Sequence, residues 1–334
     1  MNHSTPLFQH TRRRVLAGSI ALALGAASAS SLAQSGYPAK PITIIVPYAP
    51  GGQGDVFARL VGERLSVRLK QPVIVDNRPG ATGALGSRIA AKANGDGYTL
   101  LLGQTGEIAV NKFVVKTLGY DPLKDFKAVV LVGDAPLILA VPANAPFNSI
   151  QELIQAARAK PESISYASSG TATPGHLAAA ALALGTKTTM THVPYKGAGQ
   201  ALTDLLGGHV QFFFSSASAV MSQIKGGKLK ALAVSTPQRL PGLPQVPTVA
   251  ESEVPGFSFT LWGGLFAPIE TPNSVVELLN REVNDILMEP AMKARLEADG
   301  SAVRQNSPAQ FSEFVVKELV KYEGLVKATG IQAD

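Results

Sequence analysis

The sequence predicts an α/β protein with two lobes, each built on a doubly wound sheet flanked by helices. Short β-rich apolar runs lead through glycine-rich turns into helical patterns, and this alternation recurs along the chain, as in "ITIIVPYAPGGQGDVFARL". The scheme starts again at "LILAVPA", residues 137–143, after a first set of strands has ended near residue 134. Two sheets explain this restart better than one continuous parallel sheet.

Residues 1–33 are typical of an export signal. Three arginines at 12–14 precede an apolar stretch that runs to about residue 29, and small residues lead to Gln34, before which we expect cleavage. The arginines also fit a twin-arginine signal, so the Sec and twin-arginine routes both stay open. The apolar stretch is shorter than the ~20 residues that span a bilayer. We therefore expect an exported protein that is not embedded in the membrane.

The first lobe is expected to comprise residues 34–134 and 256–334, and is therefore discontinuous in sequence. Its early strands are predicted in the runs "ITIIVPY", "PVIVDN", "YTLLLG" and "KAVVLVG". "FSFTLWGGLFAP" is predicted as a strand long enough to cross between the lobes. Two C-terminal helices should pack back on this lobe: one opens at Thr271 and Pro272 and is interrupted near Pro290, and the other opens with a capping box at Ser307.

The second lobe is expected at residues 135–255. A strand at "LILAVPA" is followed by a helix at 148–160 with Asn148 or Ser149 as its cap. Further strand, loop and helix units are predicted in "SISYASSGTATPGHLAAAALAL" and "TTMTHVPYKGAGQALTDLLGG". "VQFFFSSA" and "LKALAVST" supply two more strands.

Composition excludes several classes of function. The chain has no cysteine, so a disulfide, a thiol nucleophile and a lipid-modified N-terminal cysteine are impossible. The formal net charge of +6 includes the three signal arginines, and there is no basic stripe with interleaved aromatic residues, so nucleic acid is not an expected partner. The three histidines beyond the signal are scattered and no metal motif occurs, so we expect neither a metal nor a cofactor.

Two glycine-rich loops, "APGGQGD" and "SSGTATPGH", each connect a strand end to a helix start, one in each predicted lobe. Ligands of open α/β sheets bind at the carboxyl ends of strands, and a helix N-terminus offers free N–H groups to an anion. The first loop lacks the third glycine of a dinucleotide fingerprint and there is no P-loop. The pair therefore predicts a grip on a carboxylate or phosphate rather than a nucleotide site, with Asp55 complementing the helix dipole rather than facing the anion.

The serines and the histidine of the second loop leave alternatives open. Ser168, Ser169, Thr171 and Thr173 could donate to a ligand or only cap the helix, and His176 could reach the cleft or be satisfied locally. A hydrolase using Ser169 and His176 is a further hypothesis. The chain has no G-x-S-x-G motif and no third member for a triad, so no catalytic residue is expected.

From about Tyr37 to the C-terminus the chain carries a series of ordered motifs, such as "KPITIIVPYAPGGQGDVFARL", "QPVIVDNRPGATGALGSRIAAKANGDGYTLLLG", "HVPYKGAGQALTDLLGGHVQFFF" and "GKLKALAVSTPQRLPGLPQVPTVAE". In these motifs the sequence resembles the Bug family of extracytoplasmic solute receptors, the periplasmic binding components of tripartite tricarboxylate transporters. The resemblance implies a type II periplasmic-binding-protein fold that closes on its ligand by hinge motion. It also implies a ligand carboxylate held by backbone N–H groups, hydroxyls and bridging waters from the two loops.

Carried over to this chain, the resemblance implies ligand-binding residues in both loops: Tyr48, Pro50, Gly51, Gly52, Gln53, Gly54, Asp55, Ser168, Ser169, Gly170, Thr171 and His176. Where many relatives read roughly "FDN", this chain has Phe214, Ser215 and Ser216. The missing acid weakens the case for an amino-acid ligand and adds Ser215 to the binding residues.

Gln104, Glu107 and Phe214 are candidate specificity residues. Glu107 is either an exposed loop charge or an acceptor for a ligand hydroxyl or protonated nitrogen. Trp262 is expected to pack at the hinge.

The function expected from these observations is a monomeric periplasmic receptor that delivers a small organic carboxylate to inner-membrane transporter subunits. A sensing subunit of a signalling system would have the same fold and site, and the periplasmic hydrolase is the weaker alternative. The ligand stays open among dicarboxylates, tricarboxylates, aromatic acids and nicotinate-like acids.

Overall fold

The structure, a computed structural model, describes residue 1 and residues 36–298 and 300–333. The predicted export signal therefore lies outside the described residues, apart from Met1. Pro41–Asp334 forms one compact unit, and residues 36–40 contain no helix or strand. Among the described residues, no helix is both long and apolar enough to cross a membrane.

One sheet organises the first lobe, in the order β2-β1-β3-β9-β4. Strands β1, β2 and β3 are parallel, whereas β9 runs antiparallel to both β3 and β4. Its strands are β1 (Ile42–Val46), β2 (Val73–Asn77), β3 (Thr99–Gln104), β9 (Thr260–Pro268) and the first part of β4 (Phe126–Pro142). Its helical segments are α2 (Gln53–Leu69), η1 (Ala81–Gly83), α3 (Ala84–Ala91), η2 (Gly106–Val110), α4 (Asn111–Val114), α10 (Asn273–Met288), α11 (Pro290–Ala298) and α12 (Pro308–Thr329).

A second sheet organises the other lobe, where β4 lies between β8 and β7 and is followed by β5 and β6. Strands β5, β6 and β7 are parallel, and β4 runs antiparallel to β7 and to β8. The remaining strands are β5 (Ser165–Ser168), β6 (Thr191–Pro194), β7 (Phe212–Ser216) and β8 (Leu229–Val234). The helices are α5 (Ile150–Ala159), α6 (Pro174–Thr186), α7 (Ala198–Leu206), α8 (Ala217–Lys225) and α9 (Val249–Ser252).

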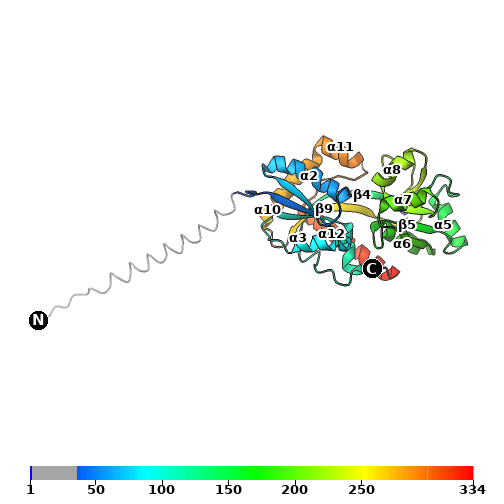
Figure 1. Cartoon of the computed structure of the whole chain (residues 1–334), viewed down its shortest axis with the longest axis horizontal. Helices are drawn as coiled ribbons and strands as arrows, with labels where there is room; N and C mark the ends of the chain where they lie inside the picture. Colours follow the sequence, from blue (N-terminus) through cyan, green and yellow to red (C-terminus); the bar gives the residue numbers. More distant parts are fainter. Residues whose placement is uncertain (2–35, 299, 334) are drawn as a thin grey trace. The chain divides into compact units, whose positions relative to one another are not determined.

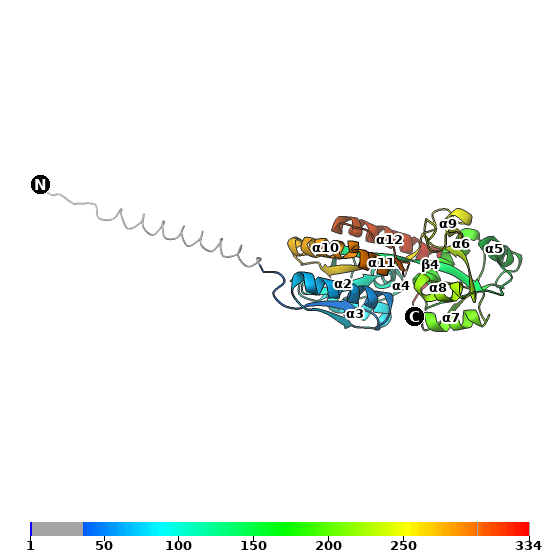
Figure 2. The ribbon, with the colours of Figure 1, turned by 90° about the horizontal axis from the view of Figure 1, so that it is seen from above.

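Strand β4 belongs to both sheets, and this corrects one expectation. The runs 127–133 and 137–143 fall, as far as Pro142, in one strand of 17 residues, whose first part pairs with β9 as far as Pro136 and whose second part pairs with β7 and β8 from Leu137. The predicted crossing segment, 257–268, is a strand only from Thr260, where β9 begins and pairs with β3 and β4. Before it, the Phe259 amide donates to the Ser235 carbonyl next to β8, so the segment does run between the lobes. Figure 1 shows β4 between the two lobes, with α2, α3 and α10 in one and α5, α6 and α7 in the other; Figure 2 shows the same division from above. The lobe limits at 134/135 and 255/256 stay a prediction.

The C-terminal helices pack on the first lobe as predicted, since α10 contacts α2 and α12 contacts η2. The capping box at Ser307 and the cap at Ser149 are present. Trp262 is fully buried, packs edge-on against Phe311 and Phe314 of α12, and donates its indole N–H to Glu318 at 2.9 Å. The tryptophan is therefore a core residue next to the point where β4 changes partners.

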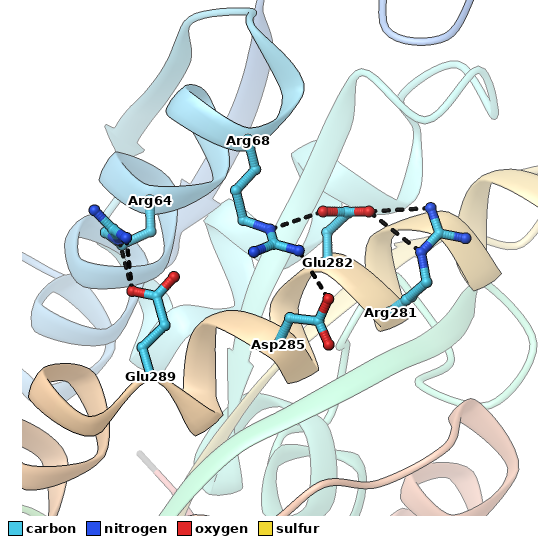
Figure 3. Close-up of polar contacts among 6 residues, drawn as sticks. All are labelled: Arg64, Arg68, Arg281, Glu282, Asp285 and Glu289. Carbon is cyan, nitrogen blue, oxygen red and sulfur yellow. Dashed lines mark hydrogen bonds and ion pairs between the residues drawn. The ribbon is translucent and has the colours of Figure 1, made fainter.

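Helix α2, which begins at the first glycine-rich loop, is tied to α10 by ion pairs on the surface (Figure 3). The Arg68 guanidinium lies 2.8 Å from Glu282 and 2.7 Å from Asp285, and Arg64 lies 2.8 Å from Glu289. Solvent screens ion pairs at the surface, so the network adds little to overall stability. It links α2 to α10 through side chains of both helices and the residue that ends α10.

Candidate functional site

The first candidate element is the loop between β1 and α2. Pro50, Gly51 and Gly52 are exposed, Gly51 has φ +90°, a conformation that favours glycine, and α2 begins at Gln53. A Cβ placed on Gly52 would meet only the Ala49 carbonyl, at 3.9 Å, so the backbone here borders open space. The first N–H groups of a helix have no partner within the helix. The start of α2 can therefore offer backbone donors to an anion.

The Asp55 carboxylate holds this loop in shape. It is 4% exposed and accepts hydrogen bonds from the Gly51 amide at 2.9 Å, from the Asn77 side chain at 3.0 Å and from the Arg59 guanidinium. Asn77 also donates to the Tyr48 carbonyl at 3.1 Å. The hydrogen bond from Arg59 is the main cause that lowers the pKa of Asp55, with burial acting in the opposite direction. The carboxylate is thus fully engaged within the protein, which leaves the Asp55 amide as its group for a ligand.

Sequence reasoning missed Arg59 and Asn77. The signals were available: Arg59 follows Asp55 by one helical turn, and Asn77 ends the strand that pairs with β1.

Glu107 is buried and hydrogen-bonded to the half-buried Tyr48, which corrects the alternative of an exposed charge at Glu107. The Glu107 side chain is fully buried, its Oε2 accepts from the Tyr48 hydroxyl at 2.7 Å, and its Oε1 accepts from the Gln104 amide at 2.5 Å. Burial raises the pKa of Glu107 to about 7, although the hydrogen bond from Tyr48 opposes the rise. Both carboxylate oxygens are occupied, so in this structure Glu107 positions Tyr48.

Gln53 and Gln104 lie where α2, β3 and β9 meet. Gln53 Nε2 donates to the Leu261 carbonyl at 3.1 Å, whereas its Oε1 is buried without a hydrogen-bond partner. A Cβ on Gly54 would lie 2.5 Å from Gln104 Oε1, so the absence of a side chain at Gly54 allows Gln104 to pack there.

The second candidate element is the loop between β5 and α6, and Ser168 is its most connected residue. The Ser168 hydroxyl is fully buried and lies 2.7 Å from His192 Nε2, 2.9 Å from the Gly170 carbonyl and 3.2 Å from the Gly170 amide. The Thr173 hydroxyl also donates to the Gly170 carbonyl, at 2.7 Å. Within the described part of the chain, the Ser169 and Thr171 hydroxyls make no hydrogen bond. These two, rather than Ser168 or Thr173, can donate to a ligand.

His176 is satisfied locally, by an amide. Its Nδ1 accepts from the Ala172 N–H at 3.0 Å, and its ring stacks on His192 with a centroid distance of 3.6 Å. Burial, with His192 as a second cause, lowers the pKa of His176 to about 3, and burial lowers that of His192 to about 4. No hydrogen bond joins His176 to Ser169, the pair that the hydrolase hypothesis requires. The serine and histidine that do meet, Ser168 and His192, have no carboxylate bonded to the ring among the described residues.

The end of β7 supplies the third candidate element. Ser215 is 3% exposed, pairs with Ile138 of β4, and its hydroxyl is buried with no hydrogen-bond partner. Phe214 is 1% exposed and stacks on Phe257, so its side chain is part of the core.

Two other features of the described residues bear on the site. They contain no group of three or more histidine, aspartate or glutamate side chains arranged to hold a metal ion. A cavity of about 780 Å³ lies between α8, α11 and the 236–242 loop, and none of the predicted ligand residues line it. The predicted ligand residues lie instead in the two glycine-rich loops, which precede α2 and α6.

Comparisons with known proteins agree with this architecture. Residues 57–331 match the family model described as "Tripartite tricarboxylate transporter family receptor". The chain is 37% identical to protein BugT of Bordetella pertussis, with 88% of this chain and 90% of the relative covered. Rpa4515 of R. palustris, solved with adipate, is 34% identical with a TM-score of 0.80, covering 89% of this chain and 100% of that one. MatC of Rhodopseudomonas palustris, solved with malate, is 31% identical with a TM-score of 0.76, covering 87% and 100%.

Proposed function

Because the chain belongs to the tripartite tricarboxylate transporter receptor family, we propose that it captures a small organic carboxylate between its lobes and delivers it to inner-membrane transporter subunits. As a member of this family the chain is a solute receptor and not an enzyme. The proposal includes a periplasmic location reached through the signal at 1–33, and a monomeric state.

One observation carries the proposed site. Gln53 Oε1 and Ser215 Oγ are buried without partners, one at the start of α2 and the other at the end of β7. Buried polar groups are nearly always hydrogen-bonded, and each one left unpaired costs about 1–3 kcal/mol. A ligand, with the waters that bridge it to the protein, would supply these missing hydrogen bonds. Both residues were predicted from the sequence to bind the ligand.

We assign the ligand to the dicarboxylates. Relatives at 34% and 31% identity were solved with adipate and malate, which both carry two carboxylates. The amides at the start of α2 suit one carboxylate, and those at the start of α6, with the Ser169 and Thr171 hydroxyls, suit the other. Ser215 and Ser216 provide no negative charge for an ammonium group, which disfavours amino acids. Gln53 Oε1 is an acceptor and fits a ligand hydroxyl or a bridging water.

A thermal-shift screen of the signal-free protein tests this function. The panel comprises adipate, malate, citrate, nicotinate and aspartate, with sucrose and choline as uncharged and cationic controls. A ligand that binds only the folded state raises the melting temperature, by the equivalent of about 2.7 kcal/mol at 100 times its Kd. We expect a saturable rise with a dicarboxylate and none with the controls. A rise with sucrose or choline and with no carboxylate would overturn the proposal.

A further inference from the structure

The loop between β5 and α6 is held at both ends by histidines that the proposed ligand contacts do not use. At its start, the Ser168 hydroxyl links His192 of β6 to both backbone groups of Gly170. At its end, His176 accepts from the amide of Ala172, which has φ +59°, a conformation that is unusual for a residue other than glycine. Only the Ser169 and Thr171 side chains between these points are left without hydrogen bonds.

The Ser168 hydroxyl has one proton, which we assign to the Gly170 carbonyl at 2.9 Å, since a carbonyl can only accept. With this assignment Ser168 Oγ accepts from the Gly170 amide and from His192 Nε2. The arrangement requires the Nε2–H tautomer of His192, in which the ring is a donor and not the acceptor that a serine nucleophile would need.

The ring of His192 contacts two other rings. It stacks on His176 of α6 at 3.6 Å and on Tyr166 of β5 at 5.1 Å; those two rings lie 6.1 Å apart, and Tyr166 also stacks on Phe212 of β7. This ring cluster joins three strands and the helix that follows the loop, so it fixes the His192 ring relative to the elements that flank the loop.

We propose that His192 is the positioning residue of the β5–α6 loop, and that its hydrogen bond to Ser168 orients the amides and hydroxyls that this loop offers to the ligand. The proposal rests on the proposed function for the identity of the site. His192 itself touches no ligand and acts through Ser168 and Gly170.

A pH dependence follows from the surroundings of His192. The titratable side chains stacked on it are His176 and Tyr166, and neither is an acid that could stabilise a positive ring. Burial keeps both imidazoles neutral at pH 7, and a proton on one would face the other at 3.6 Å. The ordered loop thus takes up a proton less readily than a loosened loop. Acidification from pH 7.5 to 5.5 should therefore loosen it and weaken ligand binding.

Two substitutions separate positioning from simple packing. His192→Gln keeps a neutral N–H donor but cannot titrate, and His192→Phe keeps a stacking ring but has no donor. His209→Gln is the matched control, because His209 is exposed. The measurements are the NMR hydrogen exchange of the Gly170 and Ala172 amides without ligand, and calorimetric titration with adipate and malate at pH 7.5 and 5.5.

We expect His192→Phe to speed exchange at Gly170 and to weaken binding, each by about tenfold, which corresponds to about 1.4 kcal/mol. His192→Gln should bind within about threefold of wild type at pH 7.5 and lose less affinity than wild type between pH 7.5 and 5.5, because only His176 of the two imidazoles can still titrate. Wild-type exchange and affinity in folded His192→Phe, or a His192 ring with its proton on Nδ1, would overturn the proposal. If His192→Phe does not fold, Ser168→Ala removes the same hydrogen bond from its other partner. Hydrogen exchange at Gly170 and calorimetric titration of that variant then test the proposal in the same way. If wild type binds neither acid, the dicarboxylate assignment fails while the exchange data still decide the role of His192.

Discussion

The Tyr48 hydroxyl donates to Glu107 Oε2 at 2.7 Å, so a side chain of the first glycine-rich loop is anchored on a carboxylate that is fully buried in the first lobe. The same hydroxyl lies 3.3 Å from the Thr82 carbonyl. A neutral Glu107 can donate to Tyr48 and direct the tyrosine proton to Thr82, whereas an ionised Glu107 must accept that proton itself. The anchor therefore has two hydrogen-bond arrangements, selected by the protonation of one acid.

Glu107→Gln should make stability less dependent on pH. The pKa of Glu107 is raised from its ordinary 4.5 to about 7, so the folded chain binds the extra proton between these values and loses stability as pH rises through them. At pH 8 this loss amounts to about 3 kcal/mol. In urea unfolding at pH 5.5 and 8.0, the unfolding free energy of the variant relative to wild type should be higher at pH 8.0 than at pH 5.5. Exposed Glu277 supplies the control Glu277→Gln, which should run parallel to wild type. If the unfolding free energies of Glu107→Gln and wild type changed equally between pH 5.5 and 8.0, the raised pKa of Glu107 would be contradicted.

Asp55→Asn should weaken the ligand grip of the first loop as well as the fold. The new amide group presents N–H donors to Gly51, Asn77 or Arg59, which all donate already. We expect a loss of about 2 kcal/mol in unfolding free energy and about a tenfold loss of affinity. Because the pKa of Asp55 is lowered from 3.8, the wild-type contribution is lost only at more acidic pH, so the defect should be constant from pH 5 to 8. Asp76→Asn, which affects only an ion pair with Arg78, is the control; equal effects of the two substitutions would count against the role of Asp55.

Gly52→Leu should block the site without disturbing the fold. The Gly52 backbone, at φ −76° and ψ 169°, accepts a side chain, and the added atoms would project into the open space beside the first turn of α2. We expect an unchanged melting temperature and at least about a tenfold loss of affinity. Gly324→Leu, on an exposed face of α12 with the same free space, controls for the added bulk. Wild-type affinity in Gly52→Leu, measured by calorimetry, would remove the first loop from the site.

Ser215→Ala should separate stability from binding. Removal of a hydroxyl that has no partner leaves the ligand-free protein as stable as wild type or more stable by up to about 1 kcal/mol, while affinity falls about fivefold to tenfold. Ser235→Ala is the opposite case, because its hydroxyl bonds to the Leu137 amide and the Phe259 carbonyl, and its loss should cost about 1–3 kcal/mol. Denaturant unfolding and calorimetry on both variants make the comparison. A Ser215→Ala protein that is destabilised and binds normally would show that the hydroxyl has a structural partner.

Local sequence predicted the strand, loop and helix units, because apolar runs, glycines and caps act over a few residues. It did not predict the single strand β4, since Gly133, Asp134 and Pro136 together suggest a break that pairing with β9 overrides. It did not predict that Glu107 is buried in η2, nor the roles of Glu107 and His192. Those roles depend on Tyr48, 59 residues from Glu107, and on Ser168, 24 residues from His192, and such distances along the chain leave no periodic signal.

Continuity of β4 also limits how the receptor can move. The segment of β4 that pairs with β9 belongs to one lobe, and the segment that pairs with β7 and β8 belongs to the other. A rotation of one lobe against the other would therefore twist β4 around Pro136 and Leu137. Irregular register at 131–133 and 139–140 brackets this short stretch. Since no ladder hydrogen bond has to change partner, opening and closing meet little resistance from the backbone. The energy difference between the two states then depends on the contacts that join the lobes, such as those of α12 with α6, and on the proposed ligand.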